Sequence, residues 1–273
     1  MQETALVTGC SSGIGRATAE LFAEEGWTVY ATSRDADDIA ALAEAGCETA
    51  ALDVTDPAGV ERVRDRILEE TGRVDCLVNN AGYAQYGPVE DIPTDRLHQQ
   101  YEVNVYGPHR MVRAVLPTMR EQGEGTIINI SSVSGRVSAP GYGAYAGSKF
   151  ALEAMSDALR AEVEGLGVEV VLVEPGPVET GFQERAAGSL EQTETRPAYG
   201  WVYSFFEDRA AVDADSLFAV GPEAVAATVH DAASVADPDP RYPVGRAARV
   251  LLLARFLPHQ LRDTVYGLVS RLP

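Results

Sequence analysis

Lysine is nearly missing from this chain: Lys149 is its single lysine, against 21 arginines, among 273 residues. Basic residues are also few: the chain has 22 Lys and Arg and 41 Asp and Glu, which gives a formal net charge of −19 at pH 7. A surface this acidic repels phosphate backbones, so we do not expect a nucleic acid as partner. Carboxylates hold water, and salt screens their mutual repulsion, so the composition predicts a halophilic protein.

Cysteine and histidine are scarce and scattered. The chain has three cysteines and four histidines, with no CxxC pair and no HExxH motif, so no metal site is expected. The first residues carry no basic segment ahead of an apolar stretch, and no apolar run reaches the ~18 residues that a membrane helix needs. Together with the odd number of cysteines, these absences predict a soluble cytoplasmic protein.

Short apolar runs alternate with helix-length amphipathic segments over the first two-thirds of the chain. Several runs are continuous Val, Ile and Leu, as is typical of strands covered on both faces. The expected strands are 5–8, 28–33, 48–53, 76–79, 126–131 and 168–174. The expected helices are 13–25, 37–44, 57–70, 95–120 and 144–164. This alternation predicts an α/β fold, a doubly wound parallel sheet of about seven strands with helices on both faces and ligands at the strand carboxyl ends.

The strand–helix pattern weakens in the last third. Residues 182–215 are polar and acidic but contain aromatic residues, so we predict a substrate lid and not a linker. These aromatic residues are Trp201, Tyr203, Phe205 and Phe206. A helix near 222–236 and a short strand near 242–244 should follow. The final stretch, 246–272, is rich in arginine and leucine and is expected to form a C-terminal helical extension of a single domain, 1–273.

The first expected strand ends in a glycine-rich loop. Its sequence is Thr8-Gly9-Cys10-Ser11-Ser12-Gly13-Ile14-Gly15, and a helix follows directly. The glycines allow a tight turn and a close approach of the backbone to a pyrophosphate, and the helix N-terminus offers free N–H groups to the phosphates. A mere tight turn explains the loop less well, because the loop follows the first strand of an α/β pattern.

Six further motifs follow in a fixed order. They are Leu52-Asp53-Val54, Asn79-Asn80-Ala81-Gly82, Asn104-x-x-Gly107, Ser132, Tyr145-x-x-x-Lys149 and Pro175-Gly176-Pro177-Val178-x-Thr180. With the loop spacing G-x-x-x-G-x-G, the chain resembles the short-chain dehydrogenase/reductase family in its single-domain Rossmann form. The segments 29–35 and 147–153 resemble its hydroxysteroid and retinol dehydrogenase branch. The resemblance implies hydride transfer between a nicotinamide cofactor and a carbonyl carbon, without a metal.

The choice of cofactor depends on the end of the second expected strand. Enzymes that use NAD place a carboxylate there for the ribose hydroxyls, whereas family spacing puts Ser33 and Arg34 at this place. A hydroxyl and a guanidinium suit a 2′-phosphate, so NADP(H) is favoured over NAD(H). In the alternative, Arg34 is a solvated loop residue and Asp35 turns in to bind the ribose.

The resemblance also assigns the other cofactor contacts. It implies that Asp53 and Val54 lie at the adenine and that Asn80, Ala81 and Gly82 support the adenosine side. The loop residues implied at the phosphates are Gly9, Ser11, Ser12, Gly13, Ile14 and Gly15. The residues implied at the nicotinamide half are Pro175, Gly176, Val178 and Thr180, together with Tyr145 and Lys149.

Tyr145 and Lys149 are four residues apart, so on a helix they share one face. The pKa of a tyrosine hydroxyl is about 10 in water, and a nearby ammonium lowers it toward the range useful in catalysis. A solvated lysine beside a packed tyrosine is the ordinary explanation of such a pair. Here Lys149 is the only lysine of the chain, and an amine whose pKa can shift is a reason to keep it where arginine cannot serve. We therefore predict Tyr145 as the general acid/base.

Ser132 follows the expected strand 126–131 and precedes Tyr145 by thirteen residues. This position puts it at the edge of the sheet where ligands bind. The resemblance implies that its hydroxyl orients the substrate oxygen. Ser131 and Ser134 are neighbours that could be mistaken for it, and the spacing to Tyr145 favours Ser132.

Asn104 completes the implied catalytic group. The resemblance implies that its amide holds a water linking Lys149 to solvent, while a helix-interior amide bonded to the backbone is the structural alternative. In the reductive direction, Tyr145 would donate a proton to the carbonyl oxygen and Ser132 would hydrogen-bond that oxygen. Lys149 would hold the nicotinamide ribose.

The aromatic residues of 182–215, with Tyr83, Tyr86 and Tyr142, indicate an apolar pocket. The branch resemblance implies a bulky hydrophobic ketone, aldehyde or alcohol as substrate. For residues 246–272, a packing helix or a subunit contact is favoured over contact with a membrane surface. Members of the family associate through the helix of the catalytic tyrosine, which implies a homodimer or homotetramer.

Other functions compete with this reading. A dinucleotide-binding sensor or scaffold without activity predicts damage to Asn104, Ser132, Tyr145 or Lys149, and all four are intact. An NAD-dependent alcohol dehydrogenase of the same family differs only in cofactor. Epimerases and dehydratases of the extended branch have another glycine spacing and a larger C-terminal part, and enoyl reductases have a longer tyrosine–lysine spacing.

Overall fold

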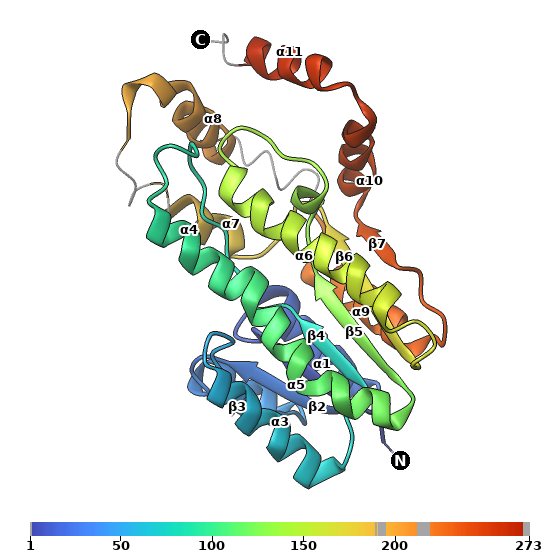
Figure 1. Ribbon diagram of the computed structural model, residues 1–273. Helices are drawn as coiled ribbons and strands as arrows, with labels where there is room; N and C mark the ends of the chain where they lie inside the picture. Colours follow the sequence, from blue (N-terminus) through green and yellow to red (C-terminus); the bar gives the residue numbers. More distant parts are fainter. Residues whose placement is uncertain (1, 189, 191–194, 212–218, 270–273) are drawn as a thin grey trace.

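A seven-stranded sheet forms the centre of the protein (Figure 1). The computed structural model describes residues 2–188, 190, 195–211 and 219–269. The strands are β1 (Thr4–Thr8), β2 (Thr28–Ser33), β3 (Glu48–Ala51), β4 (Cys76–Asn79), β5 (Gly125–Ile130), β6 (Val168–Pro175) and β7 (Arg241–Val244). They are parallel throughout, in the order β3-β2-β1-β4-β5-β6-β7. The predicted doubly wound α/β fold is therefore confirmed.

Helices cover both faces of this sheet (Figure 1). Within β1, Leu6 and Val7 point to opposite faces and belong to two separate buried clusters. Phe22 of α1 packs with Val7, and Val60 of α3 packs with Leu6. The helices are α1 (Gly13–Glu24), α2 (Ala40–Glu44), α3 (Pro57–Thr71), α4 (Thr94–Tyr101), α5 (Gly107–Gln122), α6 (Gly143–Glu162), α7 (Phe182–Gly188), α8 (Gly200–Ala211), α9 (Pro222–Ser234), α10 (Arg246–Leu253) and α11 (His259–Val269).

Local sequence explains where the helix α3 begins and ends. The Asp56 carboxylate accepts a hydrogen bond from the Ala58 N–H (3.0 Å), and Pro57 occupies the first turn, where its missing N–H costs nothing. Gly72 ends the helix with a φ of +75°, a conformation that favours glycine. The expected helix 57–70 is therefore found one residue longer.

Three expected elements differ from those in the structure in type or extent. The helix expected at 37–44 is a 3₁₀ turn, Asp37–Ile39, followed by the short helix α2. The strand expected at 48–53 ends at Ala51, because the Asp53 carboxylate accepts hydrogen bonds from the N–H (2.8 Å) and hydroxyl (2.7 Å) of Thr55 and turns the chain. The single helix expected at 95–120 is α4 and α5 joined by a π-helical turn, Glu102–Tyr106. Such turns insert an extra residue and often lie at functional sites, and this one contains Asn104.

The C-terminal third partly matches its expected elements. The helix α9 and the strand β7 lie where they were expected, and the stretch after β7 forms α10 and α11, joined through a 3₁₀ turn, Ala254–Phe256. These two helices extend beyond the end of β7, away from the sheet (Figure 1). Of the predicted lid, α7 and α8 are described, while 189, 191–194 and 212–215 lie outside the described residues. The function of this segment as a lid stays a prediction.

Candidate active site

The carboxyl ends of β1 and β4 are neighbours at the point where the strand order reverses. The Thr8 hydroxyl accepts hydrogen bonds from the N–H groups of Asn80 (3.0 Å) and Ala81 (3.1 Å). In return, Nδ2 of Asn80 donates to the carbonyls of Thr8 (2.8 Å) and Gly9 (3.0 Å). These bonds join the glycine loop to the loop after β4, at the place where open α/β sheets bind their ligands.

The glycines of the loop are required by the packing of the chain. Gly9 has a φ of +74° and Gly13 a φ of +57°. A Cβ on Gly15 would lie 2.3 Å from the carbonyl oxygen of Gly9, and a Cβ on Gly13 would lie 2.9 Å from Cγ2 of Thr180. The loop therefore has no room for larger residues, and it lies against Thr180, which the sequence assigned to the nicotinamide half.

The N-terminus of α1 opens from this loop without a side-chain cap. Ser12 at the N-cap makes no hydrogen bond to the first turn, which contains no acidic residue. The Nε of Arg16 is buried and has no hydrogen-bond partner in the described part of the chain, and Nη2 of Arg185 donates to the Ser12 hydroxyl (3.4 Å). Free N–H groups and two guanidinium groups form a site for an anion, so these residues fit the pyrophosphate of a dinucleotide.

The end of β2 lies beside the glycine loop, because the Cys10 N–H donates to the Thr32 carbonyl (2.8 Å). Ser33 is buried, and Arg34 is exposed at the start of the following loop. The Asp35 carboxylate accepts a hydrogen bond from the N–H of Asp37 (3.0 Å). Asp35 is therefore engaged in its own turn and not directed to a neighbouring strand.

Asn104 lies in the π-helical turn, close to the loop after β4. Its Oδ1 accepts from the Tyr83 N–H (3.1 Å), and its Nδ2 donates to the Tyr83 carbonyl (2.8 Å) and to the Ser148 hydroxyl (3.1 Å). A Cβ on Gly82 would lie 3.1 Å from the same Oδ1. These bonds match the structural alternative, an amide bonded to the backbone, and the role in holding a water stays a prediction.

Tyr145 and Ser132 come together although different elements carry them, the first turn of α6 and the end of β5. Tyr145 is 7% exposed, and the side chain of Ser132 lies close enough to influence the pKa of its hydroxyl. Burial raises the pKa of Tyr145 to about 12, and the Ser132 side chain offsets only part of this effect. Of the three serines considered from the sequence, Ser132 is therefore the one at the phenol.

Lys149 is buried one helical turn from Tyr145, but its charge is not among the influences found on the pKa of that phenol. Its Nζ donates to the Ile130 carbonyl (2.8 Å) and lies 6.0 Å from the centroid of the Tyr145 ring. Burial lowers the pKa of Lys149 to about 8, while the Glu153 carboxylate acts in the opposite direction. Burial of the phenol dominates the pKa of Tyr145 in the described structure, and the lowering of this pKa by Lys149 stays a prediction.

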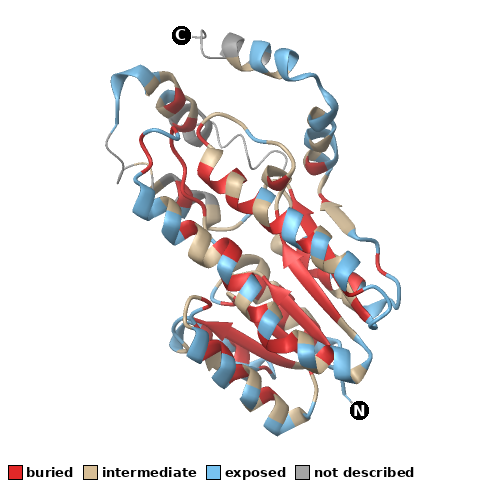
Figure 2. Cartoon of the chain, in the orientation of Figure 1, coloured by how far each residue is buried: buried red, intermediate tan, exposed pale blue. Residues whose placement is uncertain are grey.

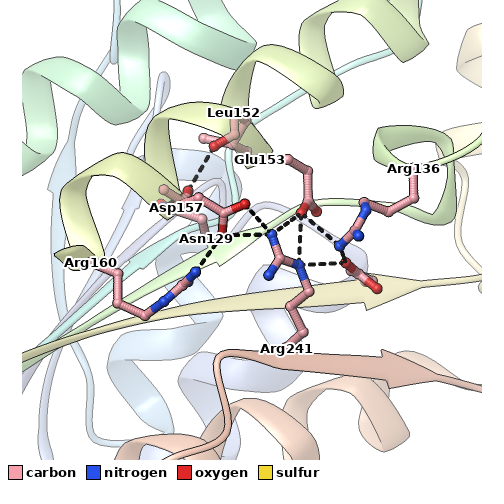
Figure 3. A network of polar contacts seen from close by, with 9 residues as sticks. Asn129, Arg136, Leu152, Glu153, Asp157, Arg160 and Arg241 are labelled. Carbon is pink, nitrogen blue, oxygen red and sulfur yellow. Dashed lines mark hydrogen bonds and ion pairs between the residues drawn. The ribbon is translucent and has the colours of Figure 1, made fainter.

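A buried charge network lies one helical turn beyond Lys149 (Figure 3). Arg241 of β7 contacts Glu153 (3.2 Å) and Glu174 (3.3 Å), and Arg136 contacts the same two carboxylates at 3.6 and 3.1 Å. Both glutamate side chains are at most 6% exposed. Burial and the carboxylate of Glu174 raise the pKa of Glu153. Ser131 and the two arginines lower it, but they offset only part of this increase. The network fixes the middle of α6 to three other elements.

Aromatic side chains cover Tyr145 on the side of the predicted lid. Its ring lies 6.2 Å from that of Tyr86 and 5.8 Å from that of Phe182, measured between centroids. Phe206 of α8 stacks on Tyr86 at 5.3 Å, and Tyr142 packs against both. These contacts form a separate apolar cluster above the catalytic edge of the sheet. They place apolar side chains around Tyr145, and the apolar substrate pocket stays a prediction.

Three residues near the site were missed from the sequence. Thr8 ties the two loops together, Arg185 reaches the glycine loop from α7, and Asp91 accepts hydrogen bonds from Tyr203 (2.6 Å) and Arg196. Thr8 could have been found, since it opens the glycine motif. The other two depend on contacts about a hundred residues or more apart in the chain, for which no local pattern exists.

The residues predicted from the sequence fall into three groups in space. One joins β1, β4 and the glycine loop, a second joins Gly13 to Thr180, and a third joins Ser132 to Tyr145 and Lys149. Val178 pairs with Val220 as an isolated bridge, and the Gly176 N–H donates to the Val244 carbonyl (3.1 Å). Asp53 is exposed at the end of β3 and bound only to its own turn among the contacts described.

Comparisons with known proteins agree with this geometry. The family model described as short chain dehydrogenase matches residues 3–189. Over 270 residues, 97% of this chain and 94% of its relative, the chain is 38% identical to the uncharacterized oxidoreductase YbbO of Escherichia coli K12. It is 35% identical over 273 residues, 96% and 95% of the two chains, to the NADPH-dependent 3-dehydrocapnine reductase of Ornithobacterium rhinotracheale. It is also 38% identical over 214 residues, 74% and 65% of the two chains, to human 17-beta-hydroxysteroid dehydrogenase type 1.

Solved structures show the same architecture. A short-chain dehydrogenase of Streptomyces avermitilis is similar with a TM-score of 0.83 and 34% identity, over 99% of this chain and 98% of that one. A short chain dehydrogenase/reductase of Burkholderia phymatum in complex with NAD has a TM-score of 0.80 and 28% identity, over 96% and 95%. The motifs, the sheet order and these relatives lead to one conclusion: the chain belongs to the short-chain dehydrogenase/reductase family of oxidoreductases.

Proposed function

We propose that the protein is an NADP(H)-dependent oxidoreductase that interconverts a bulky hydrophobic ketone or aldehyde and the corresponding alcohol. The observation that carries the proposal is Tyr145, buried under aromatic side chains and adjacent to the side chain of Ser132. A phenol with a pKa of about 12 is protonated at neutral pH, which is the form that donates a proton to a carbonyl oxygen.

Each residue of the site has one task in this reaction. The cofactor, when bound, supplies or accepts the hydride. Tyr145 Oη gives its proton to the substrate oxygen in reduction and takes it back in oxidation, while the Ser132 hydroxyl holds that oxygen. Lys149 orients the nicotinamide ribose, and the aromatic cover excludes water from the reacting carbon.

The relatives support a hydrophobic substrate. One is named an NADPH-dependent 3-dehydrocapnine reductase and another a 17-beta-hydroxysteroid dehydrogenase, and a hydroxysteroid is a polycyclic, largely apolar molecule. The cluster of Tyr86, Tyr142 and Phe206 offers an apolar wall of the same kind. We therefore expect a long or polycyclic apolar ketone to react faster than a small polar one.

The preference for NADP(H) rests on the end of β2. Arg34 is exposed beside the glycine loop, where a guanidinium can pair with a 2′-phosphate, and Asp35 would have to give up its bond to Asp37 to reach a ribose. The 3-dehydrocapnine reductase is named as NADPH-dependent, whereas the Burkholderia relative was solved with NAD. The experiment that tests the proposal is a fluorescence titration with NADPH and NADH, at low and at molar KCl.

Replacing Arg34 by aspartate is expected to lower the NADPH/NADH ratio of kcat/KM by about 10²-fold, since a charge-assisted pair worth ~1.5–3 kcal/mol becomes a repulsion. The measurement is steady-state kinetics with each cofactor. Arg120→Asp, an exposed change of the same charge on α5, is the control and should leave the ratio unchanged. An unchanged ratio in Arg34→Asp would show that the 2′-phosphate is recognised elsewhere.

A further inference from the structure

Exposed apolar side chains are concentrated in one short segment of the surface. Of the twelve large apolar residues exposed in the described part of the chain, six lie between residues 250 and 261. They are Val250, Leu251, Leu253, Phe256, Leu257 and Leu261, and Phe256 is 70% exposed. Figure 2 shows α10 and α11 largely exposed, in contrast to the buried strands. An apolar surface of this density marks an interaction site.

The same segment has the opposite charge to the rest of the chain. Residues 246–273 contain five of the 21 arginines and one of the 41 acidic residues. Arg246, Arg249 and Arg255 are exposed, so their charges lie among the exposed apolar side chains. On α10, Arg246 and Val250 are four residues apart, as are Arg249 and Leu253, which places cations and apolar side chains on one face.

Two contacts with the rest of the protein hold α10 and α11 in place without covering their exposed apolar and basic side chains. Ala248 is the buried residue of α10, and a Cβ on Gly176 would lie 3.2 Å from its backbone nitrogen. The Tyr266 hydroxyl of α11 donates to the Ser138 carbonyl (2.9 Å). Gly176 follows β6 and Ser138 follows the loop of Ser132, so the two helices are held at the edge of the sheet that contains the catalytic group.

Although the sequence favoured a packing helix or a subunit contact for this segment, we propose that α10, the 3₁₀ turn and α11 bind the surface of an anionic lipid bilayer, because the structure leaves their apolar side chains exposed. Apolar side chains enter the boundary between headgroups and acyl chains, and the arginines extend to the lipid phosphates. No helix in the described ranges is long and apolar enough to cross a bilayer, so the segment lies on the membrane and does not span it. In this orientation the acidic body, repelled by the lipid charge, faces the solvent.

A second copy of the chain is the competing occupant. Pairing of this segment with itself would bring the arginines of one copy against those of the other, at a cost in repulsion. Docking on the acidic remainder of a second copy would satisfy the charges. That surface has little apolar area to offer, because among the other described residues Phe150 and Met155 of α6 are the only two exposed large apolar side chains that share a helix. The charge pattern therefore favours a lipid surface, which satisfies apolar and basic residues together.

The test is co-sedimentation of the full chain with vesicles, at the lowest KCl at which circular dichroism shows the protein folded. Vesicles of phosphatidylglycerol and phosphatidylcholine (1:1) are compared with phosphatidylcholine alone. We expect binding to the anionic vesicles, at least tenfold weaker binding to the neutral ones, and weakening as KCl rises. Binding to neither vesicle, or to both alike, would overturn the proposal.

Variants separate the contributions of the segment. Leu253→Ser combined with Phe256→Ser, and Arg246→Gln combined with Arg249→Gln, should each raise the half-binding lipid concentration at least tenfold. Leu166→Ser combined with Val235→Ser, two exposed apolar residues outside the segment, is the control and should bind as the parent does. Light scattering without lipid tests the second copy: a smaller mass for Leu253→Ser/Phe256→Ser, with vesicle binding unchanged, would assign the face to an oligomer. Sedimentation does not depend on turnover, so the result is independent of the proposed reaction.

Discussion

Tyr145→Phe is expected to lower kcat by about 10²–10⁴-fold, the range that a positioned general acid contributes. The phenyl ring keeps the contacts with Tyr86 and Phe182, and the cofactor contacts of the glycine loop are untouched. The Kd for NADPH should therefore change less than twofold. Only the phenolic hydroxyl, the proton donor beside Ser132, is lost.

The measurement is kcat with a saturating apolar ketone, beside fluorescence titration of NADPH. Tyr142→Phe is the matched control, because it makes the same change in a second tyrosine of the same aromatic cluster, one that packs against Tyr86. It should keep activity within a few-fold of the parent. Turnover of Tyr145→Phe above one-tenth of the parent rate would remove Tyr145 from the acid–base role.

Lys149→Met is expected to abolish turnover while raising the free energy of unfolding by about 2 kcal/mol at pH 7. Burial lowers the pKa of Lys149 from 10.5 to about 8, so holding the charged form in the folded protein costs about 3 kcal/mol. The variant also loses the hydrogen bond to the Ile130 carbonyl, which lowers its free energy of unfolding by about 1 kcal/mol and leaves the net gain of about 2 kcal/mol. The lysine is thus kept at the expense of stability, as is common at active sites.

The stability cost of the buried lysine should depend on pH in a defined direction. Below pH 8 the lysine is protonated in both the folded and the unfolded chain, and the folded state bears the full cost. Between pH 8 and about 10.5 the folded state releases its proton first, so the parent gains stability and the difference from Lys149→Met shrinks. Urea unfolding without cofactor at pH 7, 9 and 10.5 measures this difference in the free energy of unfolding between the parent and Lys149→Met. Lys149→Arg, charged throughout, should show no such convergence, and a difference independent of pH would refute the assignment.

The local motifs were sufficient for the framework of the site. Gly9, Gly13 and Gly15 were predicted from a loop whose geometry leaves no space for side chains, and the spacing of Ser132 from Tyr145 selected the serine that lies near the phenol. Such signals are readable because the chemistry and the local backbone both require particular residues at fixed separations. The parallel sheet was equally readable, from continuous apolar strands that only burial on both faces explains.

Balances between opposing effects could not be predicted. The sequence places an ammonium near Tyr145, but whether its charge or the burial of the phenol dominates depends on distances that only the folded chain fixes. The π-helical turn at Asn104 also left no pattern, since it adds one residue to a helix whose apolar periodicity is intact on both sides. Long-range contacts such as Tyr203 with Asp91 join residues that carry no shared signature.

The charge network behind Lys149 has a consequence for synthesis of the protein. Glu153 and Glu174 emerge from the ribosome long before Arg241, the cation that β7 brings to both of them. Until that residue arrives, the nascent chain must bury two adjacent carboxylates with Arg136 as their described cation, or leave this part of α6 unfolded. The contacts that fix this part of the catalytic helix are therefore complete only when translation is nearly finished, and a chain released before residue 241 lacks the cation that β7 contributes to them.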